Sequence, residues 1–468
     1  MKPILHKNMA LAILAFAQLM DVLDTTIVNV AIPTISKALN ITGVNNLQWL
    51  ISVYGLTYAG FLFLAGRFAD LFGRRKVFMI GVLLFGVASI SAGLSSTSVL
   101  LIICRGLQGL GSAVIASVAL SLLISVFEEG SARNRAMVIW GTVIALGAAL
   151  GLVLGGLLTQ YINWRWIFFV NVPICALVLL ATPAFIPKLE GHGLLLVKKF
   201  DLFGTLFLTS GLIALVYGLT NVPTYGWQDR RVVEFLAAAV VLLVAFILNE
   251  LRVHEPLLQL RLFANRNVGV ASLISLLVVG SNSAMLFFIS IYNQEILGYT
   301  PLQAGLAVMP LIVLGVAVLL LVRRLLDKFG YKPIILGQLL ILVVGLLTLA
   351  GLPVIGNYAS NELPALLVMA LGLPASIGLT LAATSGIQEQ ESGAVSGVLN
   401  TAQQIGGPLV LAVLSTIAAT YTTSAAATNT KGIAAFQGIH AAFVAGSVLM
   451  LLAAIICVTT LQQKQVPK

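Results

Sequence analysis

The sequence predicts an all-α integral membrane protein with fourteen transmembrane helices, and three observations lead to this prediction. Of the 468 residues, 59% are hydrophobic and only 9% are charged, whereas soluble proteins carry about 25% charged residues. Apolar runs of about 20 residues, the length that crosses a bilayer as a helix, recur along the whole chain. These runs are continuous and do not alternate with polar residues, which argues against a transmembrane β-barrel.

The apolar runs give the predicted spans in order. They cover roughly residues 9–33, 47–66, 77–95, 99–126, 136–160, 165–186, 202–220, 232–249, 268–294, 302–322, 333–354, 363–384, 396–421 and 440–461. The first run has basic flanks like a signal peptide. It continues through Asp21 to Pro33 with no small-residue cleavage site at its end, so we expect a retained first helix.

The Lys and Arg residues predict the orientation of the chain, because cytoplasmic loops hold an excess of both. With the N-terminus inside, most of the 26 Lys and Arg residues fall in inner segments. We therefore expect a multi-pass protein of the cytoplasmic (inner) membrane with both termini in the cytoplasm. The net charge of +10 is then a topology signal, and no nucleic-acid partner is needed to explain it.

A short motif occurs twice and indicates an internal repeat. DLFGRRKV at residues 70–77 returns as DKFGYKPI at residues 327–334, and both copies lie in predicted inner loops. Their separation fits eight helix-and-loop units better than six. We predict an N-terminal six-helix bundle (1–190), two additional transmembrane helices (191–262) and a C-terminal six-helix bundle (263–468). Two repeated halves suit a transporter that rocks one half against the other.

The sequence lacks the residues that a metal-binding, disulfide-bonded, enzymatic or ATP-driven protein would need. Cys104, Cys175 and Cys457 lie in apolar runs without a CxxC pair, so we expect neither a metal site nor a disulfide framework. The four His residues fall at termini, loops or predicted helix ends, which argues against a membrane-embedded enzyme. No G-x-x-x-x-G-K-[ST] motif is present, so we expect no cofactor and an ion gradient as the energy source.

Several longer motifs resemble those of one family. The loop GRFADLFGRRK (Gly66 to Lys76) follows the pattern G-x-x-x-D-x-x-G-R-[RK]-[RK], and RGLQGLGSA (Arg105 to Ala113) resembles a helix-four motif. Three further stretches resemble motifs of a fourteen-helix branch: LDTTIVNVAIP (Leu23 to Pro33), WRWIFFVNVP (Trp164 to Pro173) and NTAQQIGGPL (Asn400 to Leu409). On these residues the chain resembles the major facilitator superfamily, in its fourteen-helix drug:proton antiporter branch.

The resemblance implies the major facilitator fold and a monomeric, proton-driven exporter of drugs or toxic compounds. One position departs from the family pattern. The helix-five motif G-x-x-x-G-P-x-x-G-G is present here from Gly147 to Gly156 with its glycines kept, but Leu152 replaces the proline. This replacement weakens the inference of antiport.

The first predicted span carries two carboxylates in an otherwise apolar run. On a helix its polar residues fall within an arc of about 140°: Gln18, Asp21, Asp24, Thr25 and Asn29. Charge in lipid costs several kcal/mol, so this stripe must face the bundle interior or a water-filled cavity. Burial favours the proton-bearing form of a carboxyl group, which suits a residue that gains and loses a proton in each cycle. The resemblance places an acid at Asp24, whereas Asp21 is not part of the family motif.

Arg105, Gln108 and Ser112 share one face of the fourth predicted span through their i, i+3, i+7 spacing. Among the acids only Asp21, Asp24 and Glu295 are expected at comparable depth, so Arg105 has few possible counter-ions. We predict that Asp24, Asp21 and Arg105 carry proton coupling, with Arg105 alternating between Asp24 and another acceptor. A permanent structural ion pair is the alternative.

Two motifs are candidates for the conformational switch. Gly147, Gly151 and Gly155 recur every four residues, which forms a groove that lets another helix approach closely. The inner loop supplies four further candidates: Gly66, Asp70, Gly73 and Arg74. The resemblance implies that Asp70 stabilises the outward-open state by contacting the start of a helix in the other half. An exposed carboxylate at a helix N-terminus stabilises by about 0.3–1 kcal/mol. A basic loop that only sets topology is the alternative.

The candidate substrate contacts are polar or aromatic residues expected near the bundle interior: Asn29, Gln108, Trp49, Tyr54, Tyr292 and Glu295. The aromatic residues could line an apolar pocket, although aromatics at helical spacing more often serve packing or interfacial belts. Glu295, near the outer end of the ninth span, is a candidate proton access point or substrate contact. A solvated helix end is the alternative for Glu295, and we favour it.

Together these features predict a proton-coupled secondary transporter that exports lipophilic, cationic compounds by alternating access. Its expected partners are protons, a small lipophilic substrate and the lipid bilayer. An unpaired carboxylate in a low-dielectric cavity attracts a cation strongly, which favours cationic substrates. Export of an endogenous metabolite, lipid or antibiotic is one alternative, and a non-coupled facilitator is another.

Overall fold

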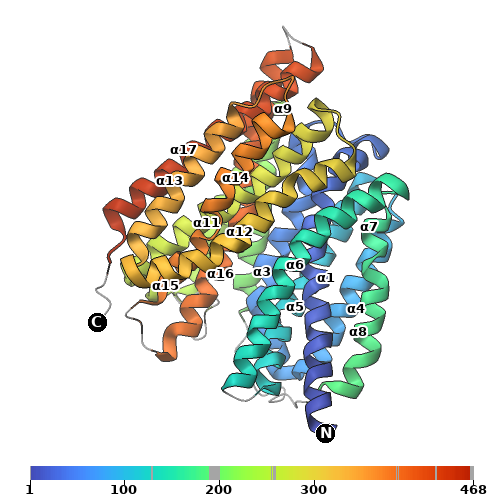
Figure 1. Cartoon of the computed structure of the whole chain (residues 1–468), viewed down its shortest axis with the longest axis vertical. Coiled ribbons are helices and arrows are strands. Elements are labelled where there is room, and N and C mark those ends of the chain that lie inside the picture. Colours follow the sequence, from blue (N-terminus) through green and yellow to red (C-terminus); the bar gives the residue numbers. More distant parts are fainter. Residues whose placement is uncertain are drawn as a thin grey trace. The chain divides into compact units, whose positions relative to one another are not determined.

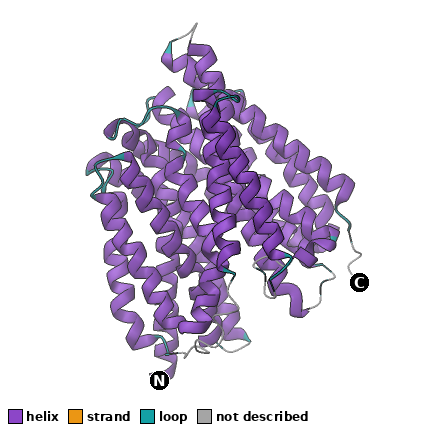
Figure 2. Cartoon of the chain, turned by 180° about the vertical axis from the view of Figure 1, so that it is seen from behind, coloured by secondary structure: helices purple, strands orange, loops and turns teal. Residues whose placement is uncertain are grey.

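The computed structural model of the chain describes residues 2–127, 130–188, 201–253, 256, 260–385, 387, 389–426 and 430–463. Within these ranges every regular element is a helix and no strand occurs (Figures 1 and 2). Thirteen of the described helices are long and apolar enough to cross a membrane, and counting the bent helix α3 (Trp49–Phe72) as one span gives fourteen. The predicted all-α membrane fold is confirmed.

The chain forms two compact units. Unit 1 comprises Met1–Ile41, Trp49–Ser210 and Ala245–Leu257, and unit 2 comprises Thr42–Gln48, Gly211–Val244 and Leu258–Lys468. The helices α9 (Leu202–Tyr225) and α10 (Arg230–Glu250) therefore contribute residues to both units. The division into residues 1–190, 191–262 and 263–468 stays a prediction. Its first boundary lies outside the described residues, as do four inner-segment lysines: Lys198, Lys199, Lys464 and Lys468.

Unit 1 holds the first six spans. Its helices are α1 (Lys2–Ala38), α3, α4 (Arg74–Gly93), α5 (Ser98–Val126), α6 (Ser131–Tyr161), the short α7 (Trp166–Phe169) and α8 (Asn171–Phe185). Large apolar side chains such as Phe78, Phe85 and Leu122 are fully buried between these helices. Cys104 and Cys175 are buried free thiols, as expected for small core residues.

Unit 2 holds the last six spans. Its main helices are α11 (Arg266–Ile291), α12 (Pro301–Phe329), α13 (Tyr331–Ala350), α14 (Leu363–Gly372), α15 (Ala375–Thr384), α16 (Glu389–Ala426) and α17 (Lys431–Thr460). The short elements are α2 (Val44–Leu47), η2 (Leu260–Ala264) and two π-helical turns, η3 (Tyr292–Ile296) and η4 (Tyr358–Glu362). Thr300 begins α12 with a capping box that it forms with Gln303, which satisfies backbone donors at the helix start.

In both copies of the repeated loop motif a glycine with positive φ turns the chain from one helix into the next. After Asp70, α3 ends and Gly73 turns the chain into α4 with φ 92°. After Asp327, α12 ends and Gly330 turns the chain into α13 with φ 78°. Glycine populates this left-handed region without a side-chain clash. The two motifs are therefore structural equivalents, as the internal repeat predicts.

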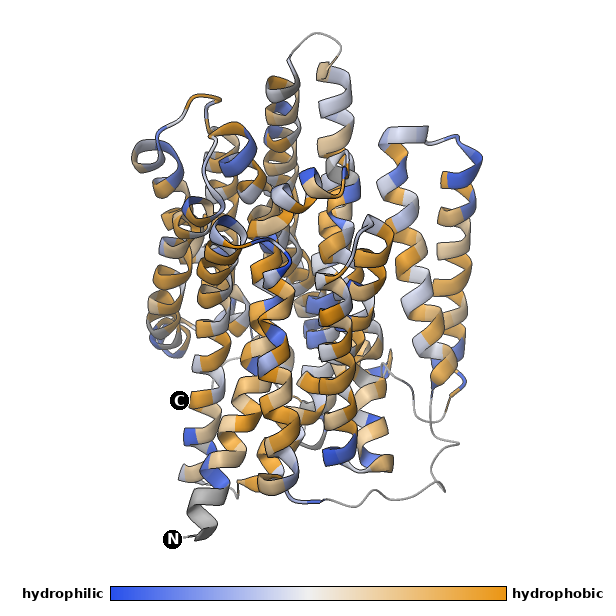
Figure 3. Cartoon of the chain, turned by 90° about the vertical axis from the view of Figure 1, so that its right-hand side faces the viewer, coloured by the Kyte–Doolittle hydropathy of each residue, from blue (hydrophilic) through white to orange (hydrophobic). Residues whose placement is uncertain are grey.

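The outer faces of the helices are apolar. Figure 3 shows hydrophobic residues along most of the length of each long helix. In α10 only 17% of the most apolar window is buried inside the protein. Exposed apolar surface on this scale is unfavourable in water and favourable in hydrocarbon. The helices are thus suited to a lipid surrounding.

Candidate functional site

The glycines of α6 bring α1 into close contact with it inside unit 1. A Cβ atom placed on Gly151 would lie 1.9 Å from Thr26 Oγ1 and 2.9 Å from the carbonyl oxygen of Leu23. A Cβ atom on Gly155 would lie 2.7 Å from the carbonyl oxygen of Ile27. The groove predicted from the glycine spacing is therefore present, and the helix that it accepts is α1. This contact fixes the helix that carries both candidate acids.

Asp24 lies at the centre of a polar cluster in unit 1. Its side chain is fully buried, and its Oδ2 forms an ion pair with Nη1 of Arg105. Its Oδ1 accepts hydrogen bonds from Nε2 of Gln108 at 3.2 Å and from Nδ2 of Asn171 at 2.8 Å. Four helices meet here, because Gln108 also donates to Ser89 Oγ on α4 at 2.8 Å. The carboxylate has a full set of partners and a counter-ion.

Arg105 is fixed in place by hydrogen bonds, its ion pair with Asp24 and a contact with an aromatic ring. Its Nε donates to the carbonyl oxygen of Leu50 at 3.0 Å, and its Nη1 also donates to Gln108 Oε1 at 2.9 Å. Its guanidinium carbon lies 4.4 Å from the centre of the Tyr54 ring, in a cation–π contact. Buried charges are stable only when paired and hydrogen-bonded, and this arginine meets both conditions.

Asp21 faces a different set of groups one turn earlier on α1. Its Oδ2 accepts from Nε2 of Gln18 at 2.9 Å, and its Oδ1 accepts from the hydroxyl of Tyr54 at 2.8 Å and from Ser112 Oγ. Within the described residues it forms no ion pair, and only 4% of its surface is exposed. The polar stripe of α1 thus faces the protein interior. Asp21 is buried among neutral donors, whereas Asp24 is charge-paired.

Asn171 is a member of this site that the sequence did not single out. It is fully buried at the first position of α8 and reaches Asp24 across unit 1. The signal was the stretch WRWIFFVNVP, whose one asparagine stands in an aromatic and apolar run. A polar residue at membrane depth is expected to find a polar partner.

The candidate switch loop lies at the surface of unit 1. Asp70 accepts from Nε and Nη2 of Arg74 at 3.1 and 3.0 Å in an exposed ion pair. Arg75 donates to the carbonyl oxygen of Ile186 at 3.2 Å, at the end of α8. Gly66 has open space around its missing side chain, with no other atom within 4 Å of a built Cβ. Gly73 supplies the positive-φ turn described above.

Several candidate substrate contacts are placed by the structure inside the protein. Gln108 and Tyr54 belong to the buried polar cluster, and Asn29 donates back to its own helix, to the carbonyl oxygen of Thr25 at 3.1 Å. Tyr292 is buried in unit 2 with its hydroxyl donating to the carbonyl oxygen of Pro353 at 2.8 Å. Trp49, at the start of α3, is half-buried.

Glu295 is exposed on η3, as the favoured interpretation of a solvated helix end predicts, and it does not share the depth of Asp21 and Asp24. The deep acid of this region is Glu362, of which 1% is exposed. Both acids lie at span ends, and the packing of η4 against its neighbours buries one while the other points outward. Apolar flanking sequence alone does not distinguish these two orientations.

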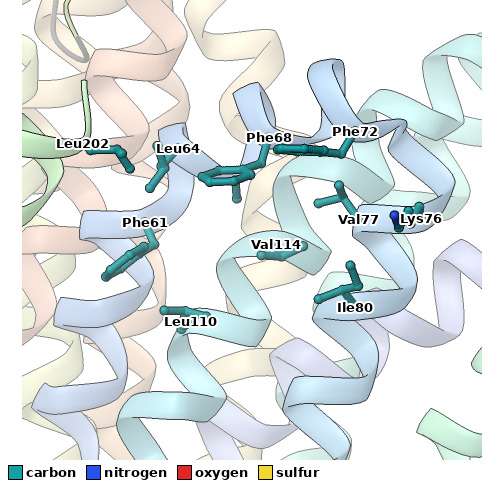
Figure 4. A pocket seen from close by; sticks show the side chains of 11 residues that line it. Phe61, Leu64, Phe68, Phe72, Lys76, Val77, Ile80, Leu110, Val114 and Leu202 are labelled. Atoms are coloured by element: carbon teal, nitrogen blue, oxygen red, sulfur yellow. The ribbon is translucent and has the colours of Figure 1, made fainter. Parts of the chain in front are cut away.

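An apolar pocket of about 500 Å³ lies in unit 1 between the second half of α3, α4 and α5. Figure 4 shows its lining, with the rings of Phe61, Phe68 and Phe72 on one side and Leu110 and Val114 of α5 on the other. Lys76 stands at its edge. The aromatics that line a pocket here are thus the phenylalanines of α3, and Trp49 and Tyr54 do not line it.

Fold and site together define a class of protein. The chain is a multi-pass, all-helical membrane protein whose two units repeat one turn motif, with a buried acid–arginine cluster in unit 1. Within the described residues no group of three His, Cys, Asp or Glu side chains could hold a metal ion. Such an arrangement is typical of secondary transporters.

Comparison with known proteins identifies the family. The chain matches the Major Facilitator Superfamily over residues 14–411 and belongs to it. The puromycin resistance protein of Streptomyces alboniger is 39% identical over 418 residues, which cover 87% of this chain and 81% of that protein. The cephamycin export protein of Amycolatopsis lactamdurans is 34% identical and the match covers 87% and 84% of the two chains.

Solved structures agree with the fold. A bacterial homologue of the lysosomal transporter Spinster superposes with a TM-score of 0.68 at 16% identity, covering 99% of both chains. A D-xylose–proton symporter gives a TM-score of 0.65 at 15% identity, covering 97% of this chain and 98% of the other. At these identities the likeness concerns the fold.

Proposed function

We propose that this protein is a proton-coupled exporter of antibiotics and other lipophilic, cationic compounds. The family supports transport. The relatives support antibiotics as substrates, since the names of two of them concern puromycin resistance and cephamycin export. A third, from Streptomyces glaucescens, is named for tetracenomycin C resistance and export and is 33% identical over 86% of this chain and 74% of its own. Export that keeps the internal concentration of a drug below the external one runs against a gradient, and that requires an energy source such as protons.

The observation that carries the proposal is the charge balance of the unit 1 cluster. Two carboxylates, Asp21 and Asp24, share the buried interior with one guanidinium, that of Arg105. With both acids ionised the cluster holds one uncompensated negative charge, which is costly in a low-dielectric interior. One proton or one cationic substrate restores neutrality. Exchange of a proton for a substrate requires a group that can bind either the proton or the cation.

The geometry favours a division of labour between the two acids. Asp24 keeps Arg105 as its counter-ion and has two further donors, so its charge is stabilised. Asp21 has only neutral donors, so it is the acid that binds the transported proton. Tyr54 connects the two, because its ring contacts Arg105 while its hydroxyl donates to Asp21. Loss of the proton from Asp21 would therefore attract Arg105 away from Asp24.

The distribution of Lys and Arg supports the cytoplasmic membrane as the location, with both termini in the cytoplasm. Energy then comes from the proton gradient, and no cofactor is involved. We further propose a monomer as the working form and the inner-loop pair Asp70 and Arg74 as part of the conformational switch.

A passive facilitator is the second candidate function, and Leu152 favours it. This residue is buried in α6 directly after Gly151, which packs against α1, and it stands at the position where the antiporter pattern has proline. A facilitator would carry the same substrates down their gradient, and its transport rate would not depend on a pH difference.

The test uses inverted membrane vesicles with a respiration-generated proton gradient and a dye whose fluorescence is quenched by that gradient. The probes are tetraphenylphosphonium and ethidium as lipophilic cations, and puromycin. Vesicles carry wild type, Asp21→Asn, Asp24→Asn or, as the matched control, Glu234→Gln. Glu234 is an exposed acid paired with Arg230 on the surface, so its loss should not affect coupling.

Wild type and the control should release quenching when a transported probe is added, whereas Asp21→Asn should lose the release. Binding of the cationic probes by purified Asp21→Asn should weaken, because this variant keeps the Asp24–Arg105 pair but lacks the carboxylate for which the proton and the cation compete. Facilitated probe movement without proton release in wild type would contradict coupling and support the passive alternative. Full coupling in Asp21→Asn with loss only in Asp24→Asn would assign the proton to Asp24.

A further inference from the structure

Unit 2 also contains a buried acid, which is not part of the unit 1 cluster. Glu362 is the last residue of η4, directly before α14, and 1% of it is exposed. Its Oε1 accepts a hydrogen bond from Nδ2 of Asn293 at 2.8 Å, and Asn293 is itself fully buried in η3. Both partners thus come from π-helical turns. Such turns are rare and occur frequently at functional sites.

Two polar atoms of this pair have no hydrogen-bond partner. Oε2 of Glu362 and Oδ1 of Asn293 are both buried and unpaired. Within the described residues no Lys, Arg or His forms an ion pair with Glu362, and Asn293 is its one polar contact. An ionised Glu362 would therefore be an isolated buried charge with an orphan oxygen, which is among the costliest arrangements in a protein interior.

The titratable groups around Glu362 do not supply a countercharge. Tyr292 lies on η3, Tyr299 between η3 and α12, and Tyr358 on η4. Two of these hydroxyls are committed elsewhere, because Tyr292 donates to the carbonyl oxygen of Pro353 at 2.8 Å and Tyr358 to that of Ala307 at 2.9 Å. Burial raises the pKa of the Tyr299 phenol, so it stays neutral.

A metal cation fits this place poorly. Calcium and magnesium ions need about six oxygen ligands. The pair offers two free oxygens, Glu362 Oε2 and Asn293 Oδ1, and within the described residues no group of three His, Cys, Asp or Glu side chains could hold a metal ion. A proton needs only one oxygen to carry it and one further oxygen to accept its hydrogen bond. A hydrogen on Oε2 would remove the charge and would supply the donor that Asn293 Oδ1 lacks, in the cyclic arrangement that acids and amides form.

We propose that Glu362 and Asn293 form a second proton-binding site, in which Glu362 carries a proton at neutral pH in the conformation described here. The site is separate from Asp21 and Asp24 and belongs to the other unit. Its occupancy does not depend on whether transport is coupled to protons, so it stands or falls independently of the proposed function. If coupling holds, the site offers unit 2 its own group for taking up or releasing a proton.

Infrared difference spectroscopy on the purified full-length protein in lipid nanodiscs tests the proposal. The carbonyl stretch of a protonated carboxyl group is separated from that of a carboxylate, and it shifts in deuterium oxide. At neutral pH wild type should show such a band, and Glu362→Gln should lose the component that Glu362 contributes, while any component from protonated Asp21 should remain. Glu295→Gln removes the exposed acid of the same region and is the matched control, which should keep the band.

A second variant separates the pairing from the protonation. In Asn293→Leu the band should persist but move to higher frequency, because the carbonyl loses the donor from Asn293. An unchanged spectrum in Glu362→Gln would overturn the proposal, since Glu362 would then be ionised and its free oxygen satisfied by water. An unshifted band in Asn293→Leu would overturn the assigned partner.

Thermal unfolding gives a readout that needs no spectral assignment. Glutamine imitates protonated glutamate, since its amide can donate to Asn293 Oδ1 while its carbonyl still accepts from Nδ2. As pH rises, wild type loses the proton and with it stability. The apparent Tm of Glu362→Gln should therefore rise relative to wild type from acidic to alkaline pH, whereas Glu295→Gln should show no such trend. A constant difference would contradict the proposal.

Discussion

The Nδ2 of Asn171 lies 2.8 Å from the Oδ1 of Asp24, which ties the start of α8 to the middle of α1 inside unit 1. This bond completes the donor set of a carboxylate that is already paired with Arg105. The consequence is a buried charge on α1 that is stabilised from two other helices, α5 and α8.

Removing the Asn171 amide should therefore cost stability. Asn171→Ala leaves a buried carboxylate with one donor fewer, which we expect to destabilise the protein by about 1–3 kcal/mol. The measurement is the apparent Tm in detergent. Asn163→Ala alters an exposed asparagine of the preceding turn and should have a smaller effect. An equal effect of both substitutions would contradict the role assigned to Asn171.

The Asp24–Arg105 pair should behave as one unit. Arg105→Gln alone leaves Asp24 as an unpaired buried charge, at a cost of about 3–5 kcal/mol. Adding Asp24→Asn removes that charge, so the double variant should be more stable than Arg105→Gln alone. Unfolding measurements on wild type, both single variants and the double variant give the coupling energy. Additive effects would show that the two charges do not depend on each other.

The groove of α6 should not accept a methyl group at Gly151. Its Cβ would lie 1.9 Å from Thr26 Oγ1 and 2.9 Å from a backbone oxygen of α1. We expect Gly151→Ala to lose about 1–3 kcal/mol of stability through overpacking. Gly141→Ala, on the same helix, meets no atom within 4 Å and should keep or raise stability. A neutral Gly151→Ala would mean that α1 can move away from α6 at little cost.

The repeated turns should require glycine for backbone reasons. Gly73 and Gly330 have φ values of 92° and 78°, and alanine there should cost about 1–2 kcal/mol. Gly66→Ala is the comparison, because it lies in α3 with open space around it and should fold normally. Folding is measured by yield and apparent Tm, and transport by the vesicle assay. Normal folding with lost transport in Gly66→Ala would place this residue in the transport cycle.

The sequence alone was sufficient to predict the features that depend on residues close together in the chain. The fourteen spans follow from the length and apolarity of each run, and the equivalence of the Gly73 and Gly330 turns follows from a repeated motif. The inward position of Asp21 and Asp24 follows from helical periodicity and the cost of charge in lipid. These properties depend on neighbours a few residues away, so they can be read from the chain without knowing how helices pack.

Tertiary structure decided which of these groups meet. Asp24 and Asn171 are 147 positions apart, and Glu362 and Asn293 are 69 apart. Such contacts depend on the rotation and height of each helix against its neighbours, which hydropathy does not specify. For the same reason the sequence did not single out Glu362 as a buried acid, although it favoured a solvated position for Glu295. Only packing between helices determines which of two acids at span ends is buried.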